Sequence, residues 1–365
     1  MKFSCLKKHL EEFLITAERF TGKNMSLPVL SSVLLETNDD SLLVSATNLE
    51  YGMQGTVPGK VFSKGRVSLP AKIISSLVQS IKDEKIDIEE KQGNVFIKTA
   101  SRDIRINGTA TEDFPILPKI KKTTSFSVEG SELRHGLESV LPASSTSEFK
   151  PELAGVFFKM AGRSLHMVAT DTFRLARKII GLEEKVEGES VSFILPYRLG
   201  QELTRVFGED EEARISLGEN QVVFETKRLK IISRLVEGNF PEYSNIIPKD
   251  FETTSHISRQ EFTDAIRAAS LFSSKLQDVG LRFHGQKLDV TSQNQEIGEY
   301  KTSLEVATSG KDIAASFNNH YILDGLSALE DEECFFGLNE SNRPSLVRDK
   351  SDESFIYVVM PIHLT

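Results

Sequence analysis

The stretch VLLETNDDSLLVSATN at Val33–Asn48 carries the pattern that decides the fold. Two apolar runs flank a short polar turn, which predicts an antiparallel β-hairpin. The same pattern returns as VFFKMAGRSLHMVATD at Val156–Asp171 and as LRFHGQKLDVTSQN at Leu281–Asn294. The copies start about 120 residues apart, a spacing too long for a solenoid repeat and typical of a small domain. The sequence therefore predicts three copies of one structural unit.

Each hairpin lies between two expected helices. In the first copy a helix is predicted from about Leu6 to Phe20, because its apolar residues recur at helical spacing. In the third copy Ser258 and Glu261 form a capping-box pattern at the start of the matching helix. The second helices are expected to begin near Pro70, Pro196 and Asn318, since proline suits a first helical turn and asparagine suits a cap. The buried stripe expected on the first of these comprises Ile73, Ile74, Leu77, Val78 and Ile81.

The order of these signals defines a fold class. Each copy reads strand, helix, strands, helix, strands, and the simplest packing is an antiparallel sheet with two helices on one side. We therefore predict an α+β protein of three structurally repeated domains, at residues 1–122, 123–249 and 250–365. The expected linkers lie near Lys119–Thr124 and Pro248–Thr254, where Pro, Lys and Thr cluster.

Composition narrows the classes of protein that remain. The chain has 365 residues and a net charge of -9, which taken alone argues against nucleic-acid binding. No apolar run is long enough to span a bilayer, and the charged N-terminus does not resemble a signal peptide, so a cytoplasmic protein is expected. Cys5 and Cys334 are far apart and in no metal-like spacing, which favours buried free thiols in a reducing compartment.

The basic residues of the expected helices leave DNA binding open. Lys72, Arg198 and His320 each lie two residues after the residue that starts the second helix of their copy. If the helices faced a common axis, these residues together with Lys23 and Arg205 would line one surface. Such a surface would contact phosphates without reading base sequence. The alternative is that these are ordinary solvated helix faces, which the glutamates on the same helices favour.

Several longer segments resemble the bacterial beta sliding clamp family, the beta subunit of DNA polymerase III. The resemblance runs from the first residues to the last, and its most specific patterns are ATD-x-x-RLA and VMP-x-x-L. The segments that carry it are LPVLSSVLLE at Leu27–Glu36, FPILP at Phe114–Pro118, VATDTFRLA at Val168–Ala176, EGNFPEYSNIIP at Glu237–Pro248 and YVVMPIHL at Tyr357–Leu364.

The resemblance implies a DNA clamp fold and a processivity factor for DNA replication. It implies a head-to-tail homodimer that forms a closed ring of six domains around double-stranded DNA, with helices inside and sheets outside. The expected partners are the DNA polymerase III catalytic subunit, a clamp loader that uses ATP, and other replication and repair proteins. No catalytic site, cofactor or metal is expected, and the chain has no G-x-x-x-x-G-K-[ST] motif for ATP.

The resemblance also implies two protein contacts. Ring closure would bring Ile104 and Ile106 on an edge strand against Leu271 and Phe272, unless the isoleucines face the core of their own domain. Arg102 and Arg105 would then pair with Glu296 and Glu299. The second contact is a cleft for partner peptides, unless Val358–Ile362 is merely a terminal core strand. Carried over by motif, the cleft comprises Leu153, Thr170, Arg174, Leu175, Pro241, Ile246, Val358, Val359, Met360, Pro361, Ile362 and Leu364.

The chain also departs from the family pattern. Thr172 and Phe173 stand where many members have Gly and His, so a narrower or more apolar cleft mouth is expected. Pro151-Glu152 stands where relatives often carry residues that touch DNA, which puts that contact in doubt. Asn24 replaces a frequent arginine in an early loop, where Lys23 is available to compensate.

The residues also bear on three other classes of function. An enzyme is disfavoured, because the seven histidines are scattered and no catalytic set recurs in the three copies. A sequence-reading regulator would need a recognition helix rich in Arg, Asn and Gln, and none is found. A protein-binding scaffold of repeated domains differs from a clamp only by the basic lining, so it stays open.

Overall fold

A computed structural model describes the chain except for residues 24–25, 110, 119, 148, 184–189, 209–210, 341–342 and 363–365. The strands pair in antiparallel fashion and form four sheets. The chain divides into two compact units, which are described separately: Met1–Gly130 with Val206–Leu235, and Ser131–Arg205 with Val236–Thr365.

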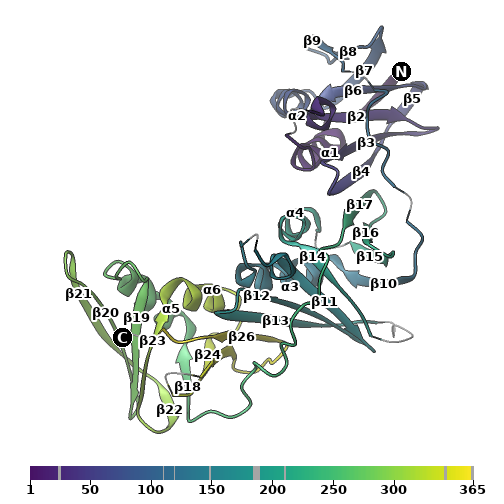
Figure 1. Cartoon of the computed structure of the whole chain (residues 1–365). Helices are drawn as coiled ribbons and strands as arrows, with labels where there is room; N and C mark the ends of the chain where they lie inside the picture. The colour runs from purple at the N-terminus through teal and green to yellow at the C-terminus, as the bar shows by residue number, and fades with distance from the viewer. Residues whose placement is uncertain are drawn as a thin grey trace. The chain divides into compact units, whose positions relative to one another are not determined.

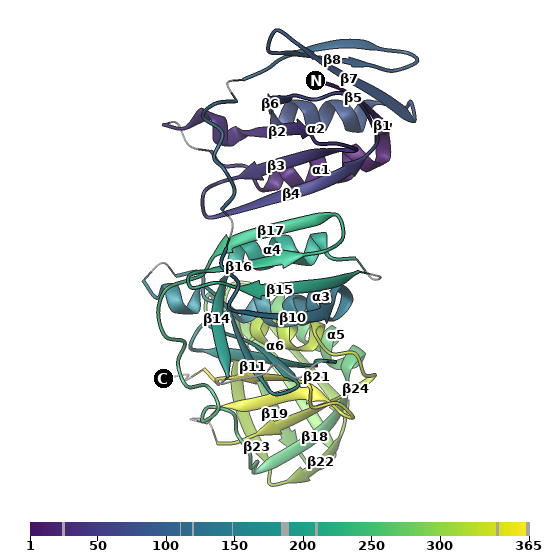
Figure 2. The same ribbon diagram turned by 90° about the vertical axis from the view of Figure 1, so that its right-hand side faces the viewer.

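The first unit contains two sheets and the helices α1 (Lys7–Arg19) and α2 (Ala71–Ser80). Both helices lie side by side against the face of the larger sheet (Figures 1 and 2). The larger sheet has the order β10 (Thr124–Glu129), β15 (Glu212–Leu217), β16 (Gln221–Glu225), β17 (Leu229–Arg234), β4 (Tyr51–Pro58), β3 (Ser41–Thr47), β2 (Ser32–Thr37) and β6 (Arg66–Pro70). The smaller has the order β5 (Lys60–Ser63), β1 (Lys2–Leu6), β7 (Lys85–Lys91), β8 (Asn94–Lys98) and β9 (Asp103–Asn107).

The second unit contains a nine-stranded and a four-stranded sheet. The nine-stranded sheet has the order β14 (Val191–Pro196), β11 (Gly155–Ala161), β12 (Ser164–Thr170), β13 (Arg174–Gly181), β26 (Phe355–Val359), β25 (Ser345–Asp349), β24 (Glu333–Leu338), β18 (Thr253–Ser258) and β22 (Ala307–Gly310). The four-stranded sheet has the order β21 (Gly298–Glu305), β20 (Lys287–Asn294), β19 (Asp278–His284) and β23 (Ile313–Asn318). The remaining helices are α3 (Gly130–Val140), α4 (Tyr197–Val206), α5 (Arg259–Ser270) and α6 (Asn319–Ser327), with short 3₁₀ turns at Pro28–Ser31, Leu141–Ala143 and Pro151–Leu153.

The structure confirms the three predicted hairpins as β2–β3, β11–β12 and β19–β20. Their turns follow ordinary turn chemistry. Asn38 Oδ1 accepts hydrogen bonds from the backbone of Asp40 and Ser41, while Gly162 and Gly285 take up positive φ angles of 63° and 54°. The repeat read from the sequence is therefore a repeat of hairpins.

The predicted helices are also confirmed, with one correction to their buried faces. Ser258 caps α5 by accepting a hydrogen bond from the Glu261 amide, and Asn318 caps α6. The expected stripe on α2 was wrong at Ile73, which is 56% exposed, whereas Ile74 and Val78 are fully buried. The buried face of α2 is made by Ala71, Ile74, Ser75 and Val78, and Ile73 lies on the other side of the helix.

The middle copy contributes strands to both units. Its strands β10 and β15–β17 belong to the first unit, and β11–β14 belong to the second. The predicted domain limits at 122/123 and 249/250 therefore stay a prediction. Among the described residues, no helix is both long and apolar enough to cross a membrane.

Candidate partner-binding surface

Two strand pairings join consecutive copies of the repeat. In the first unit, β4 of the first copy pairs with β17 of the second, and we call this pairing the first junction. In the second unit, β13 of the second copy pairs with β26 of the third, and we call it the second junction. The registers correspond residue by residue. Gly52 lies opposite Ile232 in the first junction, as Leu175 lies opposite Val358 in the second.

The same turn enters both junctions. In the second junction, Thr170 Oγ1 donates to the Arg174 carbonyl at 2.6 Å, and Asp171 Oδ1 accepts from the Phe173 and Arg174 amides. Thr172 sits at a φ of 81°, which is strained for a β-branched residue. Finally, the Met360 amide donates to the Phe173 carbonyl at 2.9 Å. This turn presents Phe173 to solvent, where it is 60% exposed.

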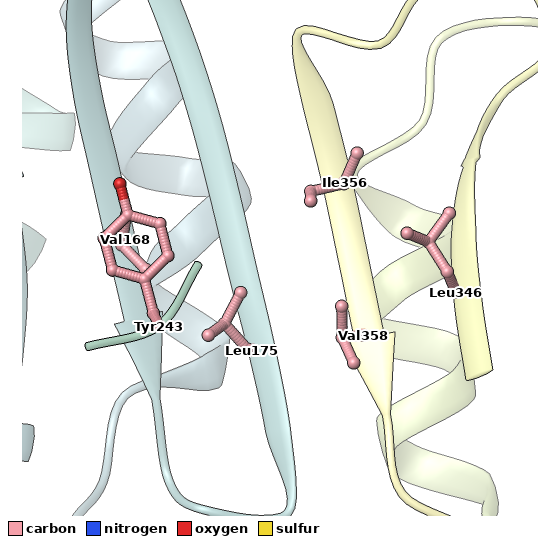
Figure 3. Close-up of a cluster of buried hydrophobic side chains, with 6 residues drawn as sticks. All are labelled: Val168, Leu175, Tyr243, Leu346, Ile356 and Val358. Carbon is pink, nitrogen blue, oxygen red and sulfur yellow. The ribbon is translucent and has the colours of Figure 1, made fainter. Parts of the chain in front are cut away.

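One face of the second junction carries a cluster of buried apolar side chains, shown in Figure 3. Because side chains alternate along a strand, Leu175 of β13 and Ile356 and Val358 of β26 share this face. Tyr243 reaches the cluster from the segment between the second and third copies. The full cluster comprises Val168, Leu175, Tyr243, Leu346, Ile356 and Val358, and we call its side of the sheet the cluster face.

The segment that follows the first unit packs on the cluster face. Phe240 stacks on Phe157 of β11 with ring centroids 4.7 Å apart. The Tyr243 hydroxyl lies 3.4 Å from His166 Nδ1, and Ile247 packs against the cluster. Ile246, one residue earlier, is 43% exposed. The segment therefore covers part of the apolar face and leaves Ile246 as an exposed apolar side chain.

The opposite side of the second junction faces α6 and holds Arg174. The guanidinium donates to Asp171 at 2.9 Å and to Asp324 on α6 at 2.5 Å, and it stacks over the Tyr321 ring at 4.1 Å. Tyr357 lies 3.4 Å from the same guanidinium. The Arg174 side chain is only 12% exposed. Arg174 was expected in the cleft for partner peptides, and in this structure its guanidinium binds groups of the protein itself.

The electrostatics of the two sides differ accordingly. Burial lowers the pKa of Arg174, but Tyr357, Asp324 and Asp171 outweigh this effect and raise its pKa overall. Burial raises the pKa of Tyr357. On the cluster face, burial and then the charges of Arg177 and Lys159 lower the pKa of His166. The α6 side is thus a charged network, whereas the cluster face is apolar at its centre and carries Arg177 and Lys159 near His166.

The structure brings only part of the expected cleft onto the cluster face. Leu175 and Val358 lie in the cluster, and the exposed Ile246 and Pro241 belong to the segment beside it. Val359 is fully buried and, by strand alternation, points with Tyr357 toward α6. Thr170 is the last residue of β12, and its hydroxyl donates to the carbonyl of Arg174 across the turn that follows.

Leu153, Met360, Pro361 and Ile362, which were also expected in the cleft, lie outside the paired strands of the second junction. Leu153 is buried in a 3₁₀ turn. Met360 is half-buried, Pro361 is buried, and the Ile362 amide donates to the Ser316 carbonyl at 2.7 Å. Leu364 lies outside the described residues.

Reasoning from the sequence missed residues that complete this surface. Tyr243 lies inside the quoted segment EGNFPEYSNIIP but was not singled out. Tyr321 and Asp324 were missed because their contact with Arg174 spans about 150 positions of chain and no local pattern signals it.

The expected DNA-facing residues are exposed. Lys72, Arg198 and His320 are each the second residue of their helix, α2, α4 and α6, so the predicted correspondence holds. Lys23 follows α1, while Asn24 lies outside the described residues. Arg205 is exposed and donates to Glu202 at 2.9 Å.

The expected ring contact involves two strands at the edges of their sheets. Ile104 and Ile106 lie on β9, where Ile106 is buried and Ile104 is half-buried. Leu271 is 71% exposed, and Phe272 stacks on Tyr300 of β21. Leu276 and Ile297, 60% and 63% exposed, were not singled out from the sequence.

The described residues contain no cluster of His, Cys, Asp and Glu able to hold a metal ion. Cys5 and Cys334 are free and buried, and burial raises the pKa of each thiol to about 12.

Models of three protein families match the chain in order. They are the N-terminal domain of the DNA polymerase III beta subunit at residues 1–118, its central domain at residues 127–242 and its C-terminal domain at residues 244–363. The beta sliding clamp of Chlamydia pneumoniae is 28% identical over 368 residues, covering 100% of this chain and 99% of that protein. The beta sliding clamp of Synechocystis is 29% identical over 389 residues, covering 100% of both.

Solved structures agree over the same length. The DNA polymerase III beta subunit of Thermotoga maritima superimposes with a TM-score of 0.94 at 26% identity, covering 100% of both chains. The sliding clamp of Pseudomonas aeruginosa bound to griselimycin gives a TM-score of 0.95 at 26% identity, again covering 100% of both.

Proposed function

The chain belongs to the DNA polymerase III beta subunit family, and on this premise we propose that it is the processivity clamp of DNA replication. In this role it is an accessory subunit without catalysis of its own. It encircles duplex DNA, slides without sequence specificity and tethers the polymerase. The observation that carries the proposal is the match of three successive clamp domains along the whole chain. The proposal includes a cytoplasmic location and the domain limits 1–122, 123–249 and 250–365.

The strand registers support a head-to-tail homodimer. Within the chain, β4 pairs with β17 and β13 pairs with β26, so each copy's fourth strand meets the next copy's last strand. By the same correspondence, β21 of the third copy should meet β9 of a first copy. Both are edge strands among the described residues, and an unpaired edge is a template for pairing with another chain. Two chains joined this way at both ends form a closed ring.

The surface chemistry near β21 supports this contact. Leu271, Leu276 and Ile297 form an unusual concentration of exposed apolar side chains beside it. Arg102 and Arg105 near β9 would meet Glu296 and Glu299, and such rim pairs mainly set register. Since Ile106 faces its own core, the apolar part of the contact comes chiefly from the third copy.

The helices supply the expected DNA contacts. Lys72 and Arg198 occupy equivalent positions and are exposed, as are Lys23 and Arg205. A few dispersed cations bind phosphates weakly and allow sliding, and local placement of charge outweighs a net charge of -9. Retention on DNA then depends on the closed ring, and tethering raises the local concentration of the polymerase at the primer end.

The cluster face of the second junction is the proposed site for partner peptides. Phe173, Ile246 and Met360 offer accessible apolar and sulfur groups beside the buried Leu175 and Val358. Methionine and aliphatic side chains adapt to Leu or Phe anchors of a short segment. The polymerase catalytic subunit, the clamp loader and other replication and repair proteins would bind here in turn.

Loading on circular DNA tests the ring. The mass of the purified chain is measured in solution, and the chain is then loaded on nicked circular plasmid with its clamp loader and ATP. We expect a dimer that stays on the circle and leaves when the plasmid is cut once. The double variant Lys72→Glu/Arg198→Glu should load less well at low salt than the control Lys287→Glu. A persistent monomer, or retention indifferent to linearisation, would favour a protein-binding scaffold instead.

Binding of the polymerase tests the partner surface separately. Phe173→Asp places a charge on the cluster face and should weaken binding of the purified catalytic subunit in the absence of DNA at least tenfold. Phe149→Asp is the matched control, because Phe149 is 96% exposed in another loop. Equal losses in both variants would refute the assignment of the surface.

A further inference from the structure

The first junction contains a groove where the second junction has its cluster. A cavity of about 350 Å³ remains open in this groove, lined by Tyr51, Gly52 and Ile232 of the paired strands and by the segment Pro115–Pro118. Leu49 and Arg234 also line the cavity. By register, Gly52 and Ile232 are the counterparts of Leu175 and Val358, so the groove has the place of the proposed partner surface.

Leu117 of the chain itself takes the place of the side chain that Gly52 lacks. A Cβ atom added to Gly52 would lie 2.4 Å from Leu117 Cδ2, so Leu117 rests directly on the Gly52 backbone. In the second junction the corresponding space is taken by the side chain of Leu175. The glycine therefore creates a pocket, and the segment between the first and second copies supplies a leucine to it.

In the described part of the chain, side-chain packing holds this segment. Phe114 is buried, whereas Ile116 is 93% exposed. Within the part of the chain that the structure describes, Pro115–Pro118 make no hydrogen bond to the strands beneath them. Two prolines keep the segment extended and limit its entropy when it is bound. A leucine on an extended, proline-flanked segment is how a short linear peptide binds a groove.

We propose that the first junction is a second peptide groove, specific for a leucine on an extended segment, and that Phe114–Pro118 occupies it in cis. A tethered segment has an effective concentration in the millimolar range, so a free peptide competes poorly while Leu117 is in place. Partner binding is thereby confined to one junction per chain. The confinement of partners to one junction rests on the function proposed above. The occupancy of the groove by Phe114–Pro118 does not depend on that function.

A peptide supplied in trans tests the proposal. The probe is a fluorescein-labelled synthetic peptide of residues 112–118, EDFPILP, titrated by fluorescence anisotropy against the full chain. Leu117→Ala should bind it at least tenfold more tightly than the unmodified chain does. The control Ile116→Ala, changed at the exposed neighbour, should bind like the unmodified chain. Equal affinity for the Leu117→Ala and unmodified chains would overturn the proposal, as would equal binding of a probe carrying Ala in place of Leu117.

A second variant keeps the test decisive if Leu117→Ala does not fold. Gly52→Ala places a methyl group against Leu117, a flexible side-chain end, and should expel it. The nuclear magnetic resonance signals of the Leu117 methyl groups, which lie against the Gly52 backbone, should then move toward the shifts of an exposed leucine, while those of Leu175 stay unchanged. Unaltered Leu117 signals would show that Leu117 does not anchor the segment at Gly52. Polymerase binding by the same preparations reports on the second junction, so failure of the proposed function would be seen separately.

Discussion

The first and second junctions share the same backbone pairing and differ in the side chains that pack on it. Both pair a fourth strand with a last strand in the same register, and both are entered by a turn with a non-glycine residue at positive φ, Leu49 or Thr172. In the first junction Gly52 accepts Leu117 from the connecting segment. In the second, Leu175 fills its own place and Tyr243 packs beside it. A repeated frame thus yields two surfaces, and single side chains decide which one is open to partners.

The sides of the two junctions that lie opposite the cluster face and the groove differ as well. Tyr51 begins β4 and packs edge-on against Phe20 at 5.3 Å, whereas its counterpart Arg174 joins a network with Asp171, Asp324 and Tyr321. The first junction is therefore held by aromatic packing at this position. The second depends on a largely buried cation.

Removal of the buried cation should have the largest effect. Arg174→Met keeps the length of the side chain but leaves Asp171 and Asp324 without their partner. Since Asp324 keeps some exposure, we expect the free energy of unfolding to fall by about 2 to 3 kcal/mol, below the range for fully buried pairs. Urea denaturation measures the loss. Arg163→Met, at an exposed hairpin, is the control, and a loss of similar size there would contradict this role for Arg174.

Relief of the strained turn should have a smaller effect of opposite sign. Thr172→Gly removes a β-branched side chain from a φ of 81°, and the gain exceeds the added entropy of the unfolded chain by about 0.5 kcal/mol. Leu49→Gly at a φ of 76° should gain less, because leucine is not β-branched and its side chain has contacts to lose. Thermal unfolding of both variants checks the order. If Leu49→Gly were the more stabilising, the strain argument would fail.

The smallest expected difference between the two junctions is in how their stability depends on pH. Burial, Arg177 and Lys159 lower the pKa of His166, whereas its counterpart in the first junction, Leu43, does not titrate. The unfolded chain then binds a proton at a higher pH than the folded chain. Stability from this source is present above the ordinary histidine pKa of about 6.5 and is lost as the pH falls toward the lowered value.

Denaturation between pH 7.5 and 5 measures this effect. His166→Gln should flatten the fall in stability over that window, and the exposed control His320→Gln should leave it unchanged. An unchanged slope in His166→Gln would show that His166 has the same pKa in both states.

Local patterns in the sequence were enough for much of this fold. Alternation, turn residues and helical spacing predicted the three hairpins, α1 and the caps of α5 and α6, because each depends on neighbours within a few residues. The error at Ile73 arose because the expected stripe on α2 was wider than the face that the helix buries, which is centred on Ile74, Ser75 and Val78. The cleft residues were carried over from a family resemblance, and the structure shows that Arg174 and Val359 point away from Leu175 and Val358.

The sequence by itself determined the repeat, the helices that carry Lys72, Arg198 and His320, and the family to which the chain belongs. These follow from local periodicity and from motifs that keep their order along the chain. Only the tertiary structure decided that β4 meets β17, that β13 meets β26, that Asp324 binds Arg174 and that Leu117 rests on Gly52. Such contacts join residues far apart in the chain, and their energies depend on packing and burial that no local pattern encodes.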